Sequence, residues 1–384
     1  MKTDRTTSTV AVYGATGFTG RLVCRQFASA GIAVAMSGRD RDKLAALHAE
    51  LPGSAVRVAA IDDPAALTSA FAGMRVVVNC AGPAHITGER VLIAALSAGA
   101  HYLDVTSDQA YMHDMYVRHE STARRSERVC LPGAGLECVV GDLAAASAAE
   151  AISGSSGAAV LRTIAPERLA ERQPFDDVAV SYIFDDLVLS PSSQRAVFDA
   201  LHARGLMWRR DRWEATGPAA QRRRIDAGDV MGGEREVLSF PGGDVITIPR
   251  HIASQSVQTF VSTSRRPAAT TALRLLARAI PVVPKRISDV LAPYVPERED
   301  YARTHFAVVA RAQRGSSTAQ VTVRGADMYR VSAAVTVWIA RQLLGRTTGP
   351  VGMRAASEVF HPQPALLQVA QTANLTVEMS PRGP

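Results

Sequence analysis

Three regularly spaced glycines are the clearest chemical signal in the chain. Gly14, Gly17 and Gly20 follow a short β-branched run at residues 9–13 and precede a helix-like stretch at 21–30. A glycine turn between a strand and a helix lets backbone N–H groups approach a phosphate, whose charge the helix N-terminus favours. We therefore predict a dinucleotide cradle, in which Gly14 permits the turn, Gly17 admits the pyrophosphate and Gly20 lets the helix pack closely. The residues between the last two glycines and beside them complete the expected contacts: Thr16, Phe18 and Thr19.

The end of the next apolar strand indicates which dinucleotide is bound. That strand ends in Ser37, Gly38 and Arg39. NAD enzymes place an acidic side chain here for the ribose 2′-hydroxyl, whereas an arginine can pair with the 2′-phosphate of NADP. Ser37 can add a hydroxyl and Lys43 lies one turn further on, so we expect NADPH to be preferred over NADH. Two alternatives stay open: Asp40 could face the ribose, and Arg39 could be a surface charge at a helix start.

Strands and helices alternate through the first 135 residues. Expected strands at 56–61, 76–78, 101–105 and 129–131 are separated by helical stretches at 64–72, 89–98 and 109–127. This alternation predicts a parallel doubly wound sheet, whose ligands bind at the carboxyl ends of the strands. Asp62 is then expected beside the adenine. The small segment of Asn79, Cys80, Ala81 and Gly82 is expected at the nicotinamide ribose.

The second half of the chain has a different pattern. Strand candidates lie at 178–189, 237–240, 244–248, 256–262, 306–313 and 319–324, with hairpin turns expected at 241–243 and 314–317. Helices are expected at 194–204, 270–280 and 328–344. Strands joined by hairpins favour a second α+β domain built on a mostly antiparallel sheet, which could cover the cofactor or pair across a dimer.

Few residues could supply a proton beside such a cofactor. The nicotinamide carries the hydride, so the protein supplies orientation and, for some substrates, a proton. No Tyr-x-x-x-Lys pair occurs, and the second half has Lys285 as its only lysine. We expect the catalytic groups to be His85, Tyr102 and Glu137, although a plain loop histidine and a structural tyrosine are open alternatives. Further candidates are His101, Asp104, Cys138, Tyr182, His251 and Tyr329.

Composition excludes several other classes of protein. The 384 residues are 47% apolar and 21% charged, as in an ordinary globular protein, with a net charge of +7. Aromatic residues make up only 5%, which argues against a nucleic-acid surface. The four cysteines show no zinc spacing, so no metal site is expected. Neither a signal peptide nor an apolar stretch of membrane-span length is apparent, so we expect a cytoplasmic protein.

Four motifs together resemble the saccharopine dehydrogenase-like family. They lie at residues 12–20, 79–83 (Asn-Cys-Ala-Gly-Pro), 101–104 (His-Tyr-Leu-Asp) and 132–135 (Pro-Gly-Ala-Gly). Within the family they look most similar to the trans-acting enoyl reductases. The chain departs from the family pattern at Ser107-Asp108, at Leu136-Glu137-Cys138 and at residues 190–194, where a substrate would be expected.

The resemblance implies a fold, a cofactor and an activity. It implies a Rossmann-type NADP-binding domain at 1–145, completed by a C-terminal helix segment at 346–384, and a substrate or dimerisation domain at 146–345. The expected function is an NADPH-dependent reductase that transfers hydride to a C=C or C=N bond of a specialised metabolite or acyl intermediate, either free or carrier-bound. Open alternatives are an enzyme acting on carbonyls, a saccharopine-type amino-acid dehydrogenase, and a dinucleotide-binding scaffold without turnover. A homodimer is compatible with each of them.

Overall fold

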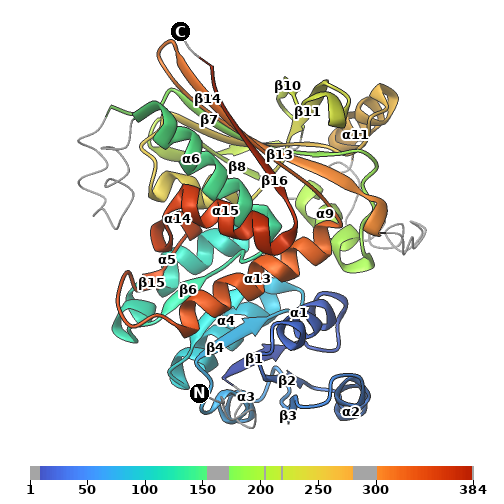
Figure 1. The fold of residues 1–384 in the computed structure, drawn as a ribbon, viewed down its shortest axis with the longest axis vertical. Coiled ribbons are helices and arrows are strands. Elements are labelled where there is room, and N and C mark those ends of the chain that lie inside the picture. The colour runs from blue at the N-terminus through green and yellow to red at the C-terminus, as the bar shows by residue number, and fades with distance from the viewer. Residues whose placement is uncertain (1–8, 154–172, 203–204, 218, 280–300, 383–384) are drawn as a thin grey trace. The chain divides into compact units, whose positions relative to one another are not determined.

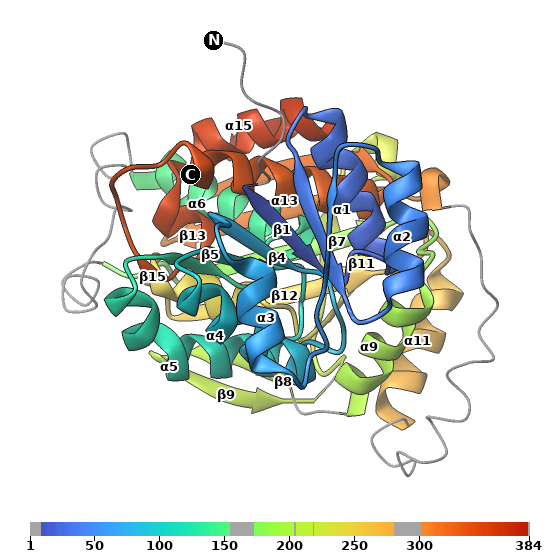
Figure 2. The same cartoon turned by 90° about the horizontal axis from the view of Figure 1, so that it is seen from below.

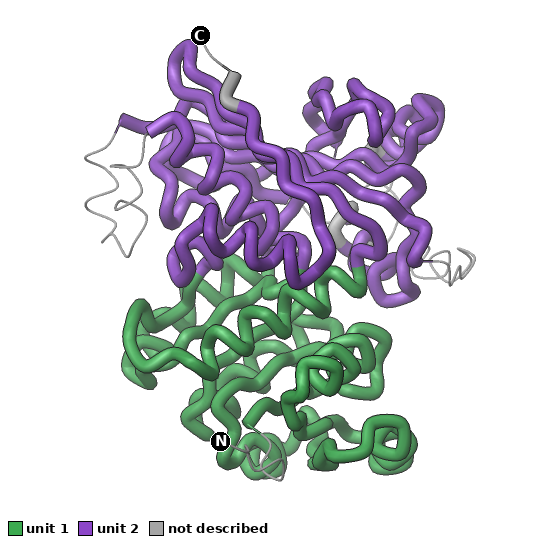
Figure 3. The backbone as a smooth tube through the Cα atoms, in the orientation of Figure 1, with its two compact units in different colours: residues 1–106, 111–135, 329–354 green, residues 107–110, 136–328, 355–384 purple. Residues whose placement is uncertain are grey.

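The computed structural model describes residues 9–153, 173–202, 205–217, 219–279 and 301–382 (Figure 1). The chain forms two compact units. Unit 1 comprises residues 1–106, 111–135 and 329–354, and unit 2 comprises residues 107–110, 136–328 and 355–384 (Figure 3). Each unit contains its own β-sheet.

Unit 1 is built on a seven-stranded parallel sheet in the order β15-β6-β5-β4-β1-β2-β3. The order of the first six strands is that of a doubly wound dinucleotide-binding sheet, which confirms the predicted fold class. The order reverses between β1 and β4, and the loops that follow these two strands lie together at the carboxyl edge. The strands are β1 (Val10–Tyr13), β2 (Val34–Gly38), β3 (Ala55–Val58), β4 (Val76–Asn79), β5 (His101–Asp104), β6 (Val129–Leu131) and β15 (Gly352–Met353).

Helices cover both faces of this sheet. Figure 2 shows α1 and α13 on one face and α3, α4 and α5 on the other. The central strands therefore have two buried faces, and β1 and β4 accordingly consist of residues that are all buried. The helices are α1 (Phe18–Ser29), α2 (Arg41–Glu50), α3 (Pro64–Phe71), α4 (Ala84–Ser97), α5 (Gln109–Arg125) and α13 (Met328–Leu344).

Unit 2 is built on a nine-stranded sheet, mostly antiparallel. Its main order is β10-β11-β12-β7-β13-β14-β16, and β8 pairs with both β12 and β9. Only β7 and β12 pair in parallel among the strands of this sheet that the structure describes. The strands are β7 (Asp177–Phe184), β8 (Gly205–Arg209), β9 (Arg212–Thr216), β10 (Arg222–Asp226), β11 (Glu234–Ser239), β12 (Ser256–Ser262), β13 (His305–Arg314), β14 (Ser317–Ala326) and β16 (Thr376–Arg382).

The helix α6 (Gly141–Ser153) lies against β13 and β14, and α15 (Pro362–Ala373) lies beside it (Figure 1). Its sequence is rich in alanine, and residues 141–149 are all buried. Small side chains allow this close approach of a helix to a sheet. Unit 2 also contains α9 (Pro191–His202), α10 (Asp244–Thr247), α11 (Pro267–Ala279) and α14 (Ala356–Val359).

The two units do not have the bounds expected for the domains. The first domain is expected to extend to residue 145, but residues 136–153 belong to unit 2, because α6 packs on that unit's sheet. The segment 346–384 was expected to return to the first domain. Only β15 joins the parallel sheet, whereas β16 pairs with β14 and residues 355–384 belong to unit 2.

One predicted strand of unit 2 is wrong. Residues 244–248 form α10 and the start of a short 3-10 turn, although Val245, Ile246 and Thr247 are β-branched. All three are buried, so tertiary packing overrides their intrinsic preference. The hairpin expected at 241–243 is therefore also wrong, although β11 and β12 do pair antiparallel. The hairpin at 314–317 is confirmed by the continuous pairing of β13 with β14.

Candidate functional site

The loop after β1 is held so tightly that it requires glycine. Gly14 has a φ of +76°, and a Cβ on it would lie 2.6 Å from the Ala81 nitrogen in the loop after β4. A Cβ on Gly20 would collide with the Gly14 carbonyl oxygen. The N–H groups of Gly14 and Ala15 both donate to the Ser37 carbonyl, at 2.9 and 3.2 Å. The glycines therefore bring together the ends of β1, β2 and β4.

The N-terminus of α1 suits an anion. Gly17 precedes the helix in an extended conformation, and its N–H donates back to the Gly14 carbonyl at 3.0 Å. No side chain caps the helix, and its first turn contains no acidic residue. The first-turn N–H groups of a helix have no intrahelical acceptor and carry a partial positive charge. This part of unit 1 thus fits the pyrophosphate of a dinucleotide.

Phe18 also has a packing partner that the sequence did not indicate. Its ring meets the edge of Tyr329 on α13, with a centroid distance of 5.0 Å and an interplanar angle of 89°. Tyr329 was a weaker candidate for catalysis, but only 6% of it is exposed. In unit 1 it supports the first turn of α1.

The tip of β2 leaves Arg39 available for a ligand. Its side chain is exposed, and no carboxylate in the described part of the chain pairs with it. Asp40, the competing feature, is the N-cap of α2. It accepts from the Lys43 N–H at 3.0 Å and pairs with the Lys43 ammonium at 3.3 Å. These contacts lower the pKa of Asp40 and tie it to the start of α2, whereas Arg39 pairs with no carboxylate in the described structure.

Ser37 and Asp62 lie at the same edge of the sheet. Ser37 is fully buried, and its hydroxyl has no hydrogen-bond partner among the described residues. Burial raises the pKa of Tyr13, while the nearby charges of Arg39 and Asp62 act on it in opposite directions. The exposed Asp62 and Arg39 therefore lie around one tyrosine, near the expected adenosine end of the cofactor.

The loop after β4 is organised by an asparagine side chain. Asn79 Oδ1 accepts from the Ala81 N–H at 3.0 Å, and Asn79 Nδ2 donates to the Thr87 hydroxyl at 3.3 Å. That hydroxyl donates to the Ala81 carbonyl at 2.7 Å. A Cβ on Gly82 would meet no atom within 4 Å. His85 follows in the first turn of α4 and is exposed, so it is accessible from solvent.

Tyr102 belongs to a buried network at the end of β5. Asp104 Oδ2 accepts from the hydroxyls of Tyr102 and Tyr111, at 3.0 and 2.9 Å. Asp104 Oδ1 accepts from the N–H groups of Thr106 and Gly133, at 3.2 and 2.9 Å. Tyr102 is fully buried, and burial raises its pKa well above the ordinary value. The geometry gives Tyr102 and Asp104 a structural role in fixing the strand ends.

His101, another candidate, is also engaged in unit 1. Its Nδ1 accepts from the Val129 N–H at 2.9 Å. Burial and three nearby arginines lower its pKa to about 4, so the ring is neutral near pH 7. A neutral imidazole that accepts a backbone N–H is tied to the β6 strand rather than poised to give a proton.

Glu137 lies in unit 2 beside a second buried network. It follows Leu136 and is partly buried, and burial raises its pKa while a hydrogen bond with Ser107 opposes the shift. The next residue, Cys138, donates its N–H to the Tyr182 hydroxyl at 3.2 Å. Tyr182 in turn donates to Asp244 Oδ2 at 3.0 Å. Sequence patterns ranked Tyr182 as a weaker candidate and gave no signal for Asp244, which lay in a predicted strand.

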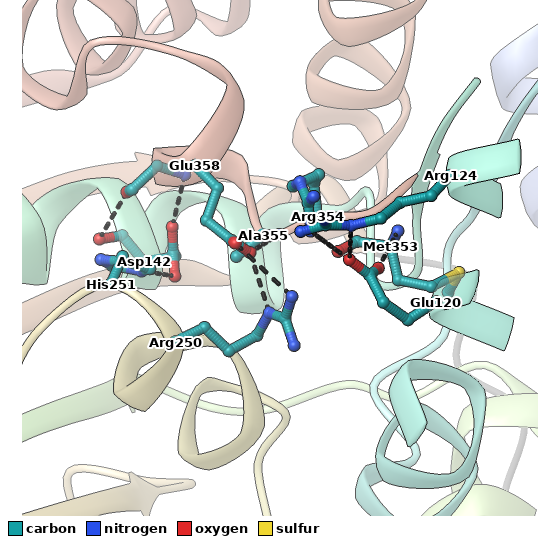
Figure 4. Close-up of polar contacts among 10 residues, drawn as sticks. Glu120, Arg124, Asp142, Arg250, His251, Met353, Arg354, Ala355 and Glu358 are labelled. Carbon is teal, nitrogen blue, oxygen red and sulfur yellow. Dashed lines mark hydrogen bonds and ion pairs between the residues drawn. The ribbon is translucent and has the colours of Figure 1, made fainter. Parts of the chain in front are cut away.

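A third carboxylate of unit 2 is fully satisfied. Asp142 Oδ1 lies 2.7 Å from His251 Nε2, and Asp142 Oδ2 accepts from the Ser357 N–H at 2.8 Å (Figure 4). Burial alone would raise its pKa, but His251 and these hydrogen bonds lower it overall. Glu358 binds Arg250 and the Ala355 N–H, both at 2.8 Å. These contacts fasten the α14 segment to the rest of unit 2.

Figure 4 also shows a cluster that belongs to unit 1. Glu120 accepts from Arg124 at 2.7 Å, from the Met353 N–H at 2.7 Å and from Arg354 at 3.0 Å. Met353 is in β15, so Glu120 holds that strand beside α5. The cluster explains how the last strand is added to the parallel sheet.

Asp244 gives unit 2 a pH-dependent stability. Burial raises its pKa to about 7; hydrogen bonding from Tyr182 opposes this, and the charges of Asp142 and Glu137 add to it. An ordinary aspartate has a pKa of about 3.9, so the folded chain holds a proton that the unfolded chain releases. We expect the unfolding free energy to decline as pH rises from about 4 to about 7, because the stabilisation from the proton on Asp244 is lost over this range.

Denaturant unfolding at several pH values between about 5 and 8 measures this slope. Asp244→Asn stays neutral and can still accept from Tyr182, so its curve should be flatter than that of the wild type. Equal slopes in the two proteins would show that Asp244 is ionised throughout this range.

Two features are absent from the residues that the structure describes. Within the described ranges, no group of three or more histidine, cysteine or acidic residues is arranged to hold a metal ion. No helix in the described part of the chain is long and apolar enough to cross a membrane.

Comparison with protein families identifies the first part of the chain. Residues 10–131 match the model described as "Saccharopine dehydrogenase NADP binding domain". "Saccharopine dehydrogenase-like oxidoreductase" of Homo sapiens is 29% identical over 161 residues, which cover 37% of this chain and 38% of that protein. A protein named as a candidate trans-acting enoyl reductase in Mycobacterium tuberculosis is 31% identical over 143 residues, covering 35% and 33%.

The similarity to other proteins has the same limited extent. "Lipid droplet localized protein" of Caenorhabditis elegans is 28% identical over 146 residues, covering 35% of this chain and 34% of that protein. The chain thus matches little more than a third of the length of these relatives. An NADPH-dependent quinone oxidoreductase from Escherichia coli, solved with NADPH, is 25% identical with a TM-score of 0.27. That match covers 37% of this chain and 54% of the other.

Proposed function

We propose that this chain, whose residues 10–131 match the model of a saccharopine dehydrogenase NADP-binding domain, is an NADPH-dependent reductase of the saccharopine dehydrogenase-like family. The observation that carries the proposal is the cradle of unit 1. Gly14 and Gly20 cannot accept a side chain, the N-terminus of α1 is uncapped, and Arg39 pairs with no carboxylate among the described residues. These three features match the pyrophosphate and 2′-phosphate of NADPH.

Different residues of unit 1 are proposed to bind different parts of NADPH. The first turn of α1 and the loop of Thr16, Gly17, Phe18 and Thr19 hold the pyrophosphate. Arg39, with Ser37, Gly38 and Lys43, receives the 2′-phosphate, and Asp62 accepts from the adenine amine. The segment Asn79–Gly82 faces the nicotinamide ribose. When bound, NADPH supplies the hydride; the chain supplies orientation and excludes water.

Two side chains are proposed to hold the proton that completes the reduction. Glu137 is the first, because its partly buried carboxyl has a raised pKa and stays protonated more readily than an exposed glutamate. His85 is the second, because it is exposed directly after the loop of β4. Tyr102 is assigned to positioning, since its hydroxyl is buried against Asp104.

The proposed substrate is an activated C=C or C=N bond in a specialised metabolite or acyl intermediate. The similarity to a protein named as an enoyl reductase favours the C=C bond.

The four cysteines are all free in the structure, which is compatible with the reducing cytoplasm.

The test combines binding with turnover. Fluorescence titration is expected to show tighter binding of NADPH than of NADH. Stopped-flow oxidation of NADPH is then followed with a panel of enoyl thioesters and cyclic imines. Rapid oxidation with one class identifies the bond reduced, and Glu137→Gln or His85→Gln should slow it. Tight NADPH binding without oxidation by any acceptor would favour a scaffold over an enzyme.

A further inference from the structure

A strained turn follows directly after Glu137. Cys138 has φ +72° and ψ −36°, a conformation that side chains other than glycine rarely adopt. Such a residue persists only where neighbouring contacts hold it in place. One such contact in unit 2 is the hydrogen bond of 3.2 Å that the Cys138 N–H donates to the Tyr182 hydroxyl.

The Tyr182 hydroxyl, which accepts this hydrogen bond, is in turn held by Asp244. Tyr182 stands on β7 and is 3% exposed, and its hydroxyl donates to both carboxyl oxygens of Asp244, at 3.2 and 3.0 Å. Asp244 is the first residue of α10 and is fully buried. A relay of hydrogen bonds therefore runs from α10 through β7 to the turn.

The start of α6 is shaped around this relay. A Cβ on Gly141 would lie 2.5 Å from the Tyr182 hydroxyl oxygen, and it would collide with Asp244 Oδ1. Glycine at this position therefore leaves room for both side chains. Three elements far apart in the sequence thus meet at the turn that carries Glu137.

We propose that Tyr182 and Asp244 are positioning residues for Glu137, holding the strained turn at Cys138 from which the glutamate is presented. The inference rests on the proposed role of Glu137 as proton donor. Among the described residues of unit 2, Ser107 is hydrogen-bonded to Glu137, and the charges of Asp244, Cys138 and Glu137 act on Tyr182. The charges of Asp142 and Glu137 act on Asp244, and His251 pairs with Asp142.

As a consequence of this positioning, the Glu137 carboxyl is partly desolvated. While the turn is held, the Glu137 side chain remains among buried neighbours, and its proton is retained to higher pH than in an exposed glutamate. When the Cys138 N–H loses its acceptor, the turn can relax to an unstrained conformation and the side chain becomes hydrated. The titration midpoint of Glu137 then moves toward the ordinary value of about 4.3.

The test follows the Glu137 carboxyl itself in the full-length protein. Its carbon NMR signal, in protein labelled at the glutamate carboxyl carbons, is assigned by its loss in Glu137→Gln. Tyr182→Phe is expected to lower the midpoint by at least about half a pH unit. Tyr116→Phe, which deletes a buried tyrosine hydroxyl in unit 1, should leave it unchanged. Equal midpoints in Tyr182→Phe and Tyr116→Phe would overturn the proposal.

A second pair of variants decides the matter if Tyr182→Phe does not fold. Asp244→Ala removes the acceptor behind Tyr182 and should lower the Glu137 midpoint. Asp244→Asn retains an acceptor oxygen and should restore it in large part. Equal midpoints in the two variants would also overturn the proposal. Neither measurement needs cofactor or substrate, so a failure to oxidise NADPH would refute the proposed function without affecting this result.

Discussion

Replacement of Arg39 by glutamine is expected to weaken NADPH binding about 10- to 150-fold, while NADH binding changes by less than about twofold. A hydrogen bond to a charged group contributes about 1.5–3 kcal/mol, which corresponds to that range of dissociation constants. The guanidinium is exposed and has no carboxylate partner in the described structure, so its full charge is available to a phosphate. Isothermal titration of each variant with both dinucleotides measures the effect.

The matched control is Arg25→Gln in the same unit. Arg25 is an exposed arginine of α1 that pairs with Glu50 at 2.8 Å. Its replacement by glutamine lowers the net charge by the same amount as Arg39→Gln but leaves the tip of β2 unchanged. Its NADPH affinity should stay within about twofold of the wild type, since general charge steering is weak at physiological salt. If both variants lose NADPH affinity equally, Arg39 acts through the overall charge and does not bind the 2′-phosphate directly.

The parallel sheet of unit 1 could be predicted because its signals are local. Each strand is a short apolar run, and glycines or polar residues mark its end, as at Gly14, Ser37 and Asn79. Parallel topology follows from alternation alone, since each crossover helix lies between two strands. The sequence therefore predicted these strand ends, and Gly14, Ser37 and Asn79 lie at the ends of β1, β2 and β4 in unit 1.

Unit 2 depends on contacts between distant residues, which a single sequence does not display. The β-branched run at 245–247 becomes a helix because all three side chains are buried there. Its first residue, Asp244, meets Tyr182 across 62 positions of chain, so no local pattern marks it as part of a polar network. Strands β8 to β10 were missed because their arginine-rich segments lack a clear apolar alternation.

The candidate acids show the same distinction. His85, Tyr102 and Glu137 are candidates because they lie near strand ends, but position in the chain does not reveal what each side chain contacts. Tyr102 is fixed against Asp104 and Tyr111, whereas His85 is exposed. Burial and hydrogen bonding therefore separate a structural tyrosine from the two groups that remain candidates.

Gly20→Ala is expected to destabilise unit 1 by about 1–3 kcal/mol and to lower NADPH affinity at least tenfold. The direction is informative, because alanine in a helix is otherwise more favourable than glycine by about 1 kcal/mol. At Gly20 the added Cβ meets the Gly14 carbonyl oxygen, a backbone atom that no rotamer change can move aside. The helix α1 must shift away from β1, and its N-terminus then leaves the phosphate position.

Thermal unfolding and NADPH titration of Gly20→Ala and Gly73→Ala distinguish the effect of a steric collision from that of backbone strain. Gly73→Ala is the control, since Gly73 has φ +77° but a Cβ there would meet no atom within 4 Å. It should lose about 1 kcal/mol through strain alone and bind NADPH normally. A Gly20→Ala protein that is as stable as the wild type and binds NADPH with unchanged affinity would mean that close packing of α1 on the glycine turn does not form the cradle.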